Sequence, residues 1–544
     1  MAHGQHARTP RPTTLAPVPL AELASLAGAT IDDNAGRPRD DLDPDLDPDL
    51  DSALNVAGVE LRAQDIRPGD LFAALPGARA HGAAFVDQAV EHGAIAVLTD
   101  AAGAELIKQA GVQVPLLLHE APRSVLGAVA ARIYGNPSDH LTLIGITGTS
   151  GKTTTAYLVE GGLAAAGHKA GLIGTVETRI AGEPIASALT TPEAPQLQAL
   201  LAVMVERGIS HVVMEVSSHA LALGRVDGCR FAVGGFTNLS QDHLDFHKDL
   251  DDYFGAKAQL FDGRSRPAAE RAVICVDDHW GSRMTDRATG EVTTVSADGH
   301  LASWVARAPE VTGVGVQSFL AETAAGAQYP VTILLPGRYN IANALLALAL
   351  LDAAGVDPAA AAAGLGEVQV PGRMERVDRG QPFLAVVDYA HKPGAVEAVL
   401  ATLRGQARGK IVLVLGAGGN RDTGKRAPMG AAAARGSDLL VVTDDNPRDE
   451  DPAAIRAEVV AGALQVAEAE RATIAETGDR RAAIVEAVRW IHAHGVGDDV
   501  VVVAGKGHES GQEVKGVKQP FDDRVELAGA IDEILAATTS EGVR

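Results

Sequence analysis

Short apolar runs alternate with Ala- and Leu-rich segments along most of the chain, starting at about residue 54. Runs such as "LTLIGIT" (141–147), "HVVMEV" (211–216) and "DLLVVTD" (438–444) are almost continuously apolar, which is typical of strands that are buried on both faces. Segments such as "NIANALLALALLDAAG" (340–355) separate them and indicate helices. This repeated strand-then-helix order predicts an α/β protein whose sheets are mostly parallel and are covered by helices on both faces.

The length of the chain and the breaks in this pattern predict several domains. At 544 residues the chain is too long for one core, and a size of about 150 residues per domain predicts about three domains. The pattern breaks near residue 140 and near Pro371 and Gly372. Residues 1 to about 17 are polar and Pro-rich, and the repeat "DDLDPDLDPDLD" (40–51) cannot bury apolar area. We predict a mostly disordered segment with an acidic insert (1–53), a smaller N-terminal α/β domain (54–140), a central domain (141–371) and a C-terminal domain (372–544).

The composition argues against several classes of protein. A formal net charge of −23 argues against a nucleic-acid partner, because phosphate contacts need clustered Lys and Arg. The two cysteines, Cys229 and Cys275, form no C-x-x-C pair, so we expect neither a disulfide framework nor a zinc site. The N-terminus lacks the apolar part of a signal peptide, and no run reaches the roughly 18 apolar residues of a membrane span. We therefore expect a cytoplasmic protein with no membrane span, and we expect a monomer.

The glycine-rich and charged motifs fall directly after predicted strands. Examples are "GTSGK" after the strand at 141–147, "DNPR" after 438–444, and "GKGHE" at the end of "DVVVVAGKGHE" (499–509). In open α/β sheets, ligands bind at the carboxyl ends of the strands. We therefore expect these motifs to line common clefts.

The loop "GITGTSGKTTT" predicts a phosphate site. It lies between the strand at 141–147 and a predicted helix that starts near Thr153, so its glycines would allow backbone N–H groups to approach phosphate oxygens. Lys152 would contact the β- and γ-phosphates, and the Thr153 hydroxyl would bind Mg²⁺. The strict G-x-x-x-x-G-K-[ST] spacing fails by one residue, because Ile146 occupies its first position. We interpret the loop as an ATP site rather than a structural turn. Its residues are Gly148, Thr149, Ser150, Gly151, Lys152, Thr153 and Thr154.

A series of motifs in unbroken order gives the chain a family resemblance. They are "TGTSGKTT", "MEVSSHAL" (214–221), "TNLSQDHLDFH" (237–247), "AKAQLF" (256–261), "LPGRYNIANALLALA" (335–349), "VDYAHKP" (387–393), "GNRDTGKR" (419–426), "DNPR" (445–448) and "GKGHE" (505–509). Any one of them is weak alone, but together they resemble the Mur ligase family over residues 54 to 535. The resemblance implies a P-loop-type central domain and a Rossmann-like C-terminal domain. It also implies ATP-dependent amide synthesis, in which a carboxylate is phosphorylated to an acyl phosphate and is then attacked by an amine.

The resemblance implies a catalytic and metal-binding group in the central domain. Two Mg²⁺ ions suit phosphoryl transfer, and carboxylates should converge with the loop hydroxyl to hold them. Lys257 would carry a carbamate formed from CO₂, which replaces an ammonium with a metal-binding carboxylate. The alternatives are a strand-end surface acid for Glu215 and a helix-surface lysine for Lys257. The implied catalytic residues are Lys152, Glu215, His243 and Lys257, and the implied metal ligands are Thr153, Glu215, His243 and Lys257.

The resemblance also implies contacts to a UDP-MurNAc-L-Ala-D-Glu substrate and to the nucleotide of ATP. The chain departs from the family pattern at Leu189, where relatives often have Asn, and at Leu223, where Gln is expected. For the UDP substrate the candidates are Leu61, Arg62, Ala63 and Gln64, with Ala78, Arg79 and Ala80 nearby, and Thr190, Thr191, Ser217 and Arg225. For ATP they are Arg338, Asn340, Asn343, Arg373, Asp388 and His391. Buried polarity at a helix start is the alternative for Asn340 and Asn343.

Arg448 bears on the identity of the third substrate. Members of the family add either meso-diaminopimelate or L-lysine, which differ by one terminal carboxylate, and a guanidinium can bind that group in a bidentate fork. "DNPR" is similar to the diaminopimelate-adding members. Arg448 could instead balance Asp449, Glu450 and Asp451 on the surface. The other implied contacts are Asp445 and Glu509 for the ammonium end, with Arg421, Asn446, Pro447 and Gly505.

We therefore predict a ligase that joins meso-diaminopimelate to the D-Glu γ-carboxylate of UDP-MurNAc-L-Ala-D-Glu, with ADP and phosphate as the other products. A lysine-adding ligase is the main alternative. Folylpolyglutamate synthetase lacks the uridine-type N-terminal domain, and the dipeptide-adding Mur enzyme does not account for "DNPR" with "GKGHE". A P-loop kinase or GTPase leaves the motifs of the third domain unexplained. A regulator that only binds nucleotide would not need Lys152, Glu215, His243 and Lys257 together.

Overall fold

The computed structural model describes residues 8–32, 54–185, 189–264 and 268–541. The acidic insert expected at 40–51 lies outside these residues. The chain divides into two compact units, one made of residues 1–295 and 346–361 and the other of 296–345 and 362–544.

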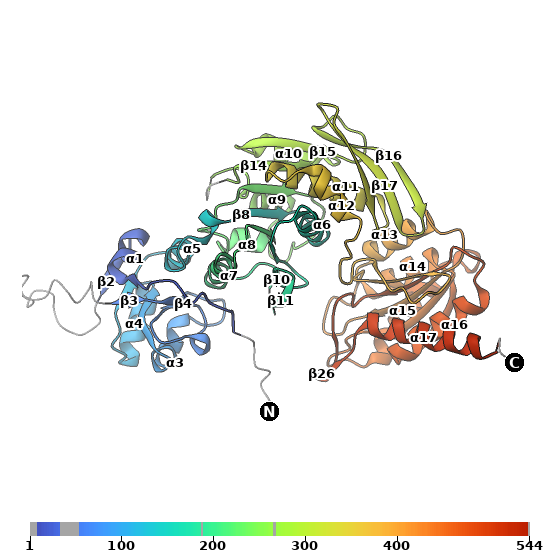
Figure 1. Cartoon of the computed structure of the whole chain (residues 1–544). Helices are drawn as coiled ribbons and strands as arrows, with labels where there is room; N and C mark the ends of the chain where they lie inside the picture. The colour runs from blue at the N-terminus through green and yellow to red at the C-terminus, as the bar shows by residue number, and fades with distance from the viewer. Residues whose placement is uncertain (1–7, 33–53, 186–188, 265–267, 542–544) are drawn as a thin grey trace, which may run out of the picture. The chain divides into compact units, whose positions relative to one another are not determined.

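The N-terminal part of the first unit is a five-stranded sheet of order β2-β7-β6-β5-β4, in which only β2 is antiparallel to its neighbour (Figure 1). Alternate strand residues enter different cores: Leu71 and Leu98 belong to one cluster, and Phe72 and Val97 to the other. The strands are β2 (Thr30–Asp32), β4 (Gly58–Glu60), β5 (Asp70–Ala73), β6 (Ala94–Thr99) and β7 (Leu116–Leu118). The helices are α1 (Leu20–Ala27), α3 (Val86–Glu91), α4 (Ala101–Ala110) and α5 (Pro122–Ile133). Short 3₁₀ turns lie at Ala63–Asp65, Gly82–Phe85 and Pro137–His140.

The N-terminal segment is more ordered than the sequence analysis expected. Strand β1 (Val18–Pro19) pairs with β3 (Asn55–Val56), and α1 buries Leu20 and Leu23 against the first core. Before β1, Arg11 donates to both oxygens of Asp70 at 2.6 and 2.8 Å and to Glu60 Oε1 at 3.3 Å. The Pro-rich composition hid these contacts, because the two carboxylates lie far along the chain from Arg11.

The buried Glu60 gives this part of the molecule a specific pH dependence. Burial raises the pKa of Glu60 from 4.5 to about 7, since Arg11 gives its two shortest bonds to Asp70 and only partly offsets the desolvation of Glu60. A raised carboxyl pKa contributes stability that is complete below pH 4.5 and is lost as the pH rises through about 7. Glu60→Gln should therefore stabilise the protein relative to wild type by an amount that grows between pH 5 and pH 8, by about 1–3 kcal/mol.

Urea unfolding of both chains at pH 5 and pH 8 measures this difference. Glu91→Gln, which alters an exposed glutamate of the same domain, is the matched control and should show no such growth. Equal pH slopes for wild type and Glu60→Gln would contradict the assignment.

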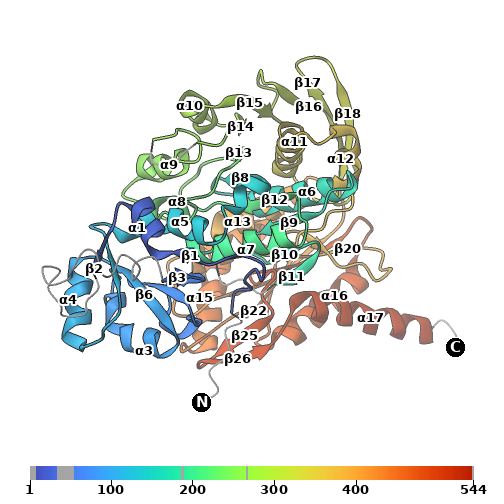
Figure 2. The same ribbon diagram turned by 60° about the vertical axis from the view of Figure 1, so that its left-hand side comes forward.

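The central sheet of the first unit brings the motif-bearing strands together. The order is β11-β10-β9-β12-β8-β13-β14-β15 (Figure 2). Strands β9, β12, β8, β13, β14 and β15 are parallel to one another, and β10 is antiparallel to both of its neighbours. Strand β8 lies between β12 and β13, so the loops that follow these three strands leave the same edge of the sheet. The strands are β8 (Thr142–Thr147), β9 (Ala170–Ile173), β10 (Thr178–Ile180), β11 (Glu183–Ile185), β12 (His211–Glu215), β13 (Val233–Phe236), β14 (Arg271–Cys275) and β15 (Glu291–Ser296).

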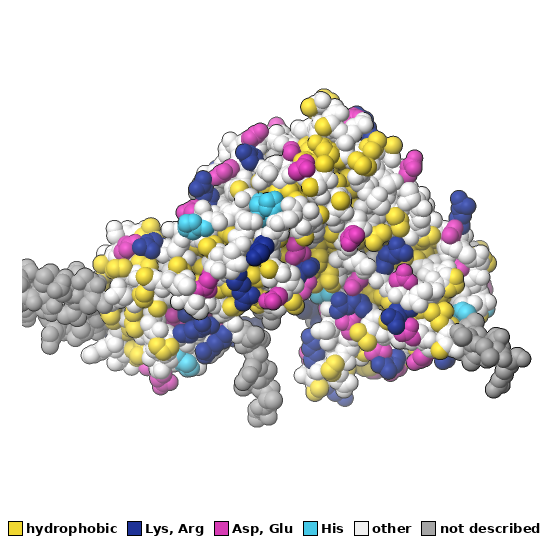
Figure 3. All heavy atoms as spheres, in the orientation of Figure 1, with side chains coloured by type: hydrophobic (Ala, Val, Ile, Leu, Met, Phe, Trp, Pro, Cys, Tyr) yellow, Lys and Arg dark blue, Asp and Glu magenta, His cyan; other side chains and the backbone are white. Residues whose placement is uncertain are grey.

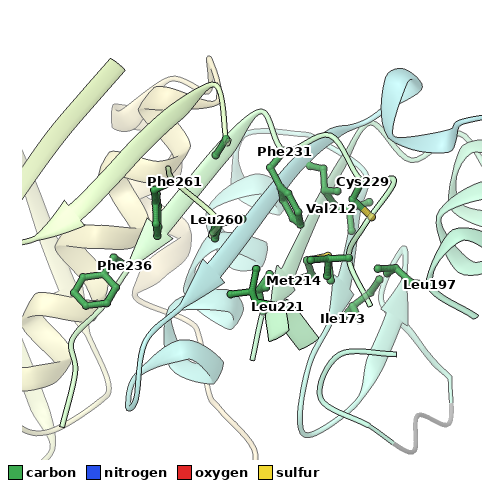
Figure 4. Close-up of a cluster of buried hydrophobic side chains, with 14 of the residues drawn as sticks. Ile173, Leu197, Val212, Met214, Leu221, Cys229, Phe231, Phe236, Leu260 and Phe261 are labelled. Carbon is green, nitrogen blue, oxygen red and sulfur yellow. The ribbon is translucent and has the colours of Figure 1, made fainter. Parts of the chain in front are cut away.

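Two helices of this sheet begin at aspartates whose side chains accept a backbone N–H. Asp249 and Asp278 cap α9 and α10 in this way. Phe231, Met214, Leu221 and their neighbours form the core shown in Figure 4. The helices are α6 (Lys152–Ala165), α7 (Ala194–Glu206), α8 (Ser218–Ala222), α9 (Leu250–Ala258) and α10 (His279–Arg287).

The second unit contains an antiparallel set, β16-β17-β18, and a six-stranded sheet of order β19-β20-β24-β21-β22-β23. In the six-stranded sheet only β19 is antiparallel, and cores lie on both faces. The strands are β16 (Trp304–Gly313), β17 (Val316–Thr323), β18 (Gln328–Ile333), β19 (Glu375–Arg376), β20 (Leu384–Asp388), β21 (Ile411–Ala417), β22 (Leu439–Asp444), β23 (Thr473–Glu476) and β24 (Val500–Ala504), with a hairpin of β25 (Gly511–Val514) and β26 (Val517–Pro520).

Helices cover the six-stranded sheet on both faces, which confirms the predicted α/β class. Residues of α13, α14 and α15 contribute to one core, and residues of α16 and α17 to the other. The helices are α13 (Pro393–Arg404), α14 (Arg426–Gly436), α15 (Pro452–Leu464), α16 (Arg480–His494) and α17 (Asp523–Glu541), with a 3₁₀ turn at Glu468–Glu470. The chain passes between the units at three points: one at the end of β15, and two within the helices α11 (Arg338–Ala353) and α12 (Pro358–Leu365).

The surface carries charges of both signs. On the face drawn in Figure 3, Lys and Arg side chains are interspersed with Asp and Glu side chains. Arg379 with Asp532, at 2.8 Å, is one exposed pair of this kind. Among the described residues, no helix is both long enough and apolar enough to cross a membrane.

Candidate active site

The loop between β8 and α6 has the backbone of an anion site. Gly148 and Gly151 have φ values of 143° and 90°, and a Cβ on Gly148 would lie 1.8 Å from Thr237 Oγ1. Helix α6 begins at Lys152, so its first N–H groups have no carbonyl partner within the helix and face the loop. Asn238, after β13, fixes the loop by accepting from Ser150 N at 3.0 Å. This arrangement suits phosphate oxygens.

Lys152 folds back over the loop. Its Nζ donates to the carbonyl oxygens of Gly148 at 2.8 Å and Thr149 at 2.9 Å. The ammonium is therefore held beside the backbone that would surround a phosphate group.

Glu215 ends β12 and faces the first turn of α6. Its carboxylate accepts from Thr153 Oγ1 at 3.0 Å on both oxygens, and from Thr175 N at 2.8 Å and Thr175 Oγ1 at 3.0 Å. Its side chain is buried, so the expected alternative of a strand-end surface acid is wrong. Thr175 was not predicted, although it follows β9 directly and the rule that motifs follow strands could have found it.

Lys257 lies on α9 and is also buried, which excludes the alternative of a surface lysine. Its Nζ donates to Gly148 O at 2.7 Å and lies 4.3 Å from the centre of the Tyr253 ring. Burial, and then the charge of Lys152, hold the pKa of Lys257 well below the usual range of a lysine. The ammonium of Lys257 therefore loses its proton more readily than that of an exposed lysine.

His243 lies in a cluster of rings. It has a φ of 54°, and its ring centre is 4.9 Å from that of His219 and 6.1 Å from that of Tyr253. Across the part of the chain that the structure describes, no three His, Cys, Asp or Glu side chains gather closely enough to hold a metal ion. The structure therefore does not bring His243 and Glu215 together with a third such ligand.

The candidates for the UDP substrate in this unit lie next to Glu215. Thr191 Oγ1 donates to Glu215 O at 2.8 Å and accepts from Ser217 N at 3.1 Å. Ser217 Oγ caps α8, and Thr190 contacts Thr175 through their hydroxyls at 3.0 Å. Arg225 donates to Thr191 O at 3.4 Å and pairs with Glu193 at 2.8 Å.

The N-terminal candidates lie on loops that follow β4 and β5. Leu61 is half-buried, Ala63 is buried, and Gln64 is exposed. Arg62 is exposed and pairs with Asp65 at 3.5 Å. Ala78, Arg79 and Ala80 are exposed as well.

The polar side chains at the start of α11 bind one another. Asn340 donates to Pro336 O at 2.7 Å, and Asn343 donates to Asn340 Oδ1 at 3.0 Å. Arg338 pairs with Asp298 at 2.6 Å. The contacts of the two asparagines match the alternative of buried polarity at a helix start, and their role toward ATP stays a prediction.

In the second unit, loops that follow β20, β21, β22 and β24 enclose a pocket of about 530 Å³. Cationic and anionic side chains both line it, so it suits a ligand with charges of both signs. Its lining residues are Tyr389, His391, Lys392, Pro393, Gly418, Arg421, Asp422, Lys425, Asp445, Asn446, Arg448, Gly505 and Glu509.

Arg448 is held at the wall of this pocket. It has a φ of 53°, its backbone N donates to Glu513 O at 3.0 Å, and its carbonyl accepts from Lys515 N at 2.7 Å. The guanidinium donates to Gly419 O at 2.6 Å and lies 3.3 Å from Glu513 Oε2.

The acidic neighbours proposed as surface partners of Arg448 have other contacts. Glu450 binds Arg426 at 2.8 Å, Asp451 caps α15, and Asp449 accepts from Asn420 at 3.3 Å.

A second group at this pocket surrounds Asp388, the last residue of β20. Asp388 is buried and accepts from Met374 N and Ala390 N, each at 2.8 Å, and burial raises its pKa. The guanidinium of Arg373 lies 4.5 Å from the centre of the Tyr389 ring. His391 contacts Tyr389 O at 2.8 Å, and burial lowers the pKa of its imidazole.

Comparisons with known proteins agree with this architecture. Residues 55–134 match the Mur ligase family catalytic domain, 146–351 the Mur ligase middle domain, and 372–507 the Mur ligase glutamate ligase domain. The chain is 53% identical over 494 residues to the "UDP-N-acetylmuramoyl-L-alanyl-D-glutamate--2,6-diaminopimelate ligase" of Corynebacterium glutamicum, covering 90% of this chain and 95% of the relative. It is 52% identical to the Streptomyces coelicolor protein of the same name, covering 96% and 98%. A solved structure of a ligase with that name is 31% identical, with a TM-score of 0.66 over 89% of this chain and 96% of that one.

The chain therefore belongs to the Mur ligase family. This confirms the resemblance carried by the ordered motifs and the three-domain fold. The roles of individual side chains are not decided by these comparisons and are proposed below.

Proposed function

We propose that the chain is an ATP-dependent ligase that joins an amino group of meso-diaminopimelate to the D-Glu γ-carboxylate of UDP-MurNAc-L-Ala-D-Glu. The observation that carries this proposal is the pocket that Arg448 lines together with Asp445 and Glu509. A diaminopimelate molecule has ammonium and carboxylate groups at both ends, and this pocket offers charges of both signs. The names of the relatives at 50–54% identity agree with this substrate.

The reaction needs positioning and charge neutralisation more than covalent chemistry from the protein. The γ-phosphoryl group of ATP moves to a carboxylate oxygen and leaves ADP and an acyl phosphate. The amine nitrogen then attacks the carbonyl carbon of the acyl phosphate. The bond between this carbon and the phosphate oxygen breaks, phosphate leaves with the bonding electrons, and the nitrogen loses a proton. Backbone N–H groups of residues 148–154, with Lys152, would bind the phosphates, and Thr190, Thr191, Ser217 and Arg225 would hold the acyl substrate.

Mg²⁺ fits the donor atoms at the start of α6. The Thr153 hydroxyl and the Glu215 carboxylate are hard oxygen donors that already meet at 3.0 Å. Bound there, the ion would neutralise phosphate charge. Thr153 and Glu215 would hold it, with Thr175 orienting the carboxylate. His243 stays a candidate ligand for a second ion.

We also propose that Lys257 is carbamylated. A neutral amine attacks CO₂, forms an N–C bond and releases one proton, and burial of Lys257 favours the neutral amine. The product is an anion with two oxygen atoms, which suits the neighbourhood of a cation better than an ammonium does. The carbamate would serve as a ligand of the second Mg²⁺.

The domain roles follow from the positions of these groups in the chain. Residues 54–140 would bind the uridine part of the substrate, 141–371 the ATP phosphates, and 372–544 the added amino acid, with Arg373, Asp388 and His391 directed to the nucleotide. Both cysteines are buried and unlinked, which suits a reducing cytoplasm. We expect a monomer.

Phosphate release with ATP, Mg²⁺ and UDP-MurNAc-L-Ala-D-Glu tests the proposal when meso-diaminopimelate and L-lysine are compared as amines. Turnover that depends on diaminopimelate alone is the expected result. Turnover with L-lysine instead would keep the ligase and remove Arg448 from substrate recognition. Phosphate release without any amine dependence would favour a P-loop kinase or GTPase.

A further inference from the structure

Lys506 is a buried cation directly behind the pocket of the second unit. It lies two residues after the end of β24 and belongs to the "GKGHE" motif. It does not line the pocket, and its side chain has 0% exposure. A buried ammonium is costly unless nearby groups compensate for its lost hydration. The groups that compensate for it therefore indicate what Lys506 does.

These groups are three side chains that do line the pocket. Lys506 Nζ donates to Asn446 Oδ1 at 3.1 Å and lies 3.8 Å from Asp445 Oδ1 and 3.7 Å from Glu509 Oε2. Asn446 in turn donates to Glu509 Oε2 at 2.8 Å and accepts from Glu513 N at 2.9 Å. One ammonium thus links the loops after β22 and β24.

A neighbouring buried cation has a different arrangement. Arg480 binds both oxygens of Asp523, each at 2.7 Å, and donates to Ala504 O at 2.9 Å, so its charge is matched inside the protein. Lys506 instead shares its charge between Asp445 and Glu509, whose other sides face the pocket. Burial lowers the pKa of Lys506, and both carboxylates act against this shift.

We propose that Lys506 is a positioning residue for amino-acid recognition: it orients Asn446 and holds the carboxylates of Asp445 and Glu509 in place, so that they receive the ammonium group of the added amino acid. This inference rests on the proposed function and extends it to a side chain that does not touch the substrate. Without the buried cation, Asn446 would lose a hydrogen-bond donor and the two carboxylates would repel each other.

Lys506→Met in the full chain tests the proposal through amine-dependent phosphate release. The KM for meso-diaminopimelate should rise about 10-fold or more, which is the range for a lost charge-assisted interaction, while the KM for ATP changes little. The other charged groups facing these carboxylates, Arg480 with Asp523 and also Lys425, are present in both chains.

Two further variants keep the test decisive. Lys506→Gln retains a donor for Asn446 without the charge, so it should show a smaller rise in the KM for meso-diaminopimelate, again with little change in the KM for ATP. Lys410→Met removes a lysine of the same unit that pairs with Asp438 at 3.2 Å outside the pocket, and it should leave both KM values unchanged. If Lys506→Met does not fold, the two KM values of Lys506→Gln decide.

An unchanged KM for meso-diaminopimelate in both Lys506 variants, or equal rises in the KM for all three substrates, would overturn the inference. Wild-type protein is assayed in the same series. If it shows no diaminopimelate-dependent turnover, the proposed function itself fails, and the inference falls with it.

Discussion

Lys257→Ala should lose almost all ligase activity, with kcat lower by about 10²- to 10³-fold, a range typical of removing one preorganised electrostatic group from an active site. Lys257 is buried beside the phosphate loop, where its Nζ contacts Gly148 O at 2.7 Å. A carbamate on this nitrogen would supply a second negative charge beside the phosphate loop, in addition to that of Glu215. Alanine supplies none, and it leaves a space where the side chain had been.

That space makes the experiment more specific than a simple loss of activity. Formate or acetate added to Lys257→Ala should restore part of the rate, because a small carboxylate can occupy the position of the missing carbamate. The measurement is phosphate release with all three substrates, with and without the added acid. Lys248→Ala, which alters an exposed lysine just before α9, is the control and should keep wild-type activity. Full activity in Lys257→Ala would rule out the carbamate.

Arg448→Ala should raise the KM for meso-diaminopimelate by about 10- to 150-fold, which corresponds to a charge-assisted hydrogen bond of about 1.5–3 kcal/mol. The KM for ATP should change little, since Arg448 belongs to the loop after β22, whereas Asp388 and His391, the candidates for the nucleotide, lie at and after the end of β20. Arg448→Lys should recover only part of the loss, because an ammonium cannot form the bidentate fork.

Initial rates measured while one substrate at a time is varied separate these effects. Arg379→Ala, which breaks an exposed ion pair with Asp532, is the matched control in the same unit. A rise of equal size in the KM for ATP and for the amino acid would mean that Arg448 supports the fold of the loop rather than the substrate.

The sequence predicted the fold class well, because continuous apolar strands separated by helices leave few other architectures. It also predicted that the motifs would follow strands. It could not predict that β8 pairs with both β12 and β13. Strand β9 lies between β8 and β12 in the chain, yet it pairs with β12 on the side away from β8. Strand order depends on long-range pairing that no local pattern contains.

The sequence also could not predict the surroundings of some side chains. Thr175 stands outside the motifs, yet it gives two hydrogen bonds to Glu215. Lys506 stands inside a motif, but its complete burial depends on Asp445 and Asn446, about 60 residues earlier in the chain. The Pro-rich N-terminus indicated disorder because the carboxylates that bind Arg11 are distant in sequence.

Arg11 therefore makes the described residues before β1 part of the folded structure. Proteolysis before Val18 would remove the guanidinium and leave Asp70 and Glu60 enclosed without it. Thr13, which binds Glu206 at the end of α7 through its hydroxyl at 2.6 Å, would be lost in the same cut. A protein shortened at this point would keep every motif of a ligase and still lack the cation that pairs with Asp70 and Glu60.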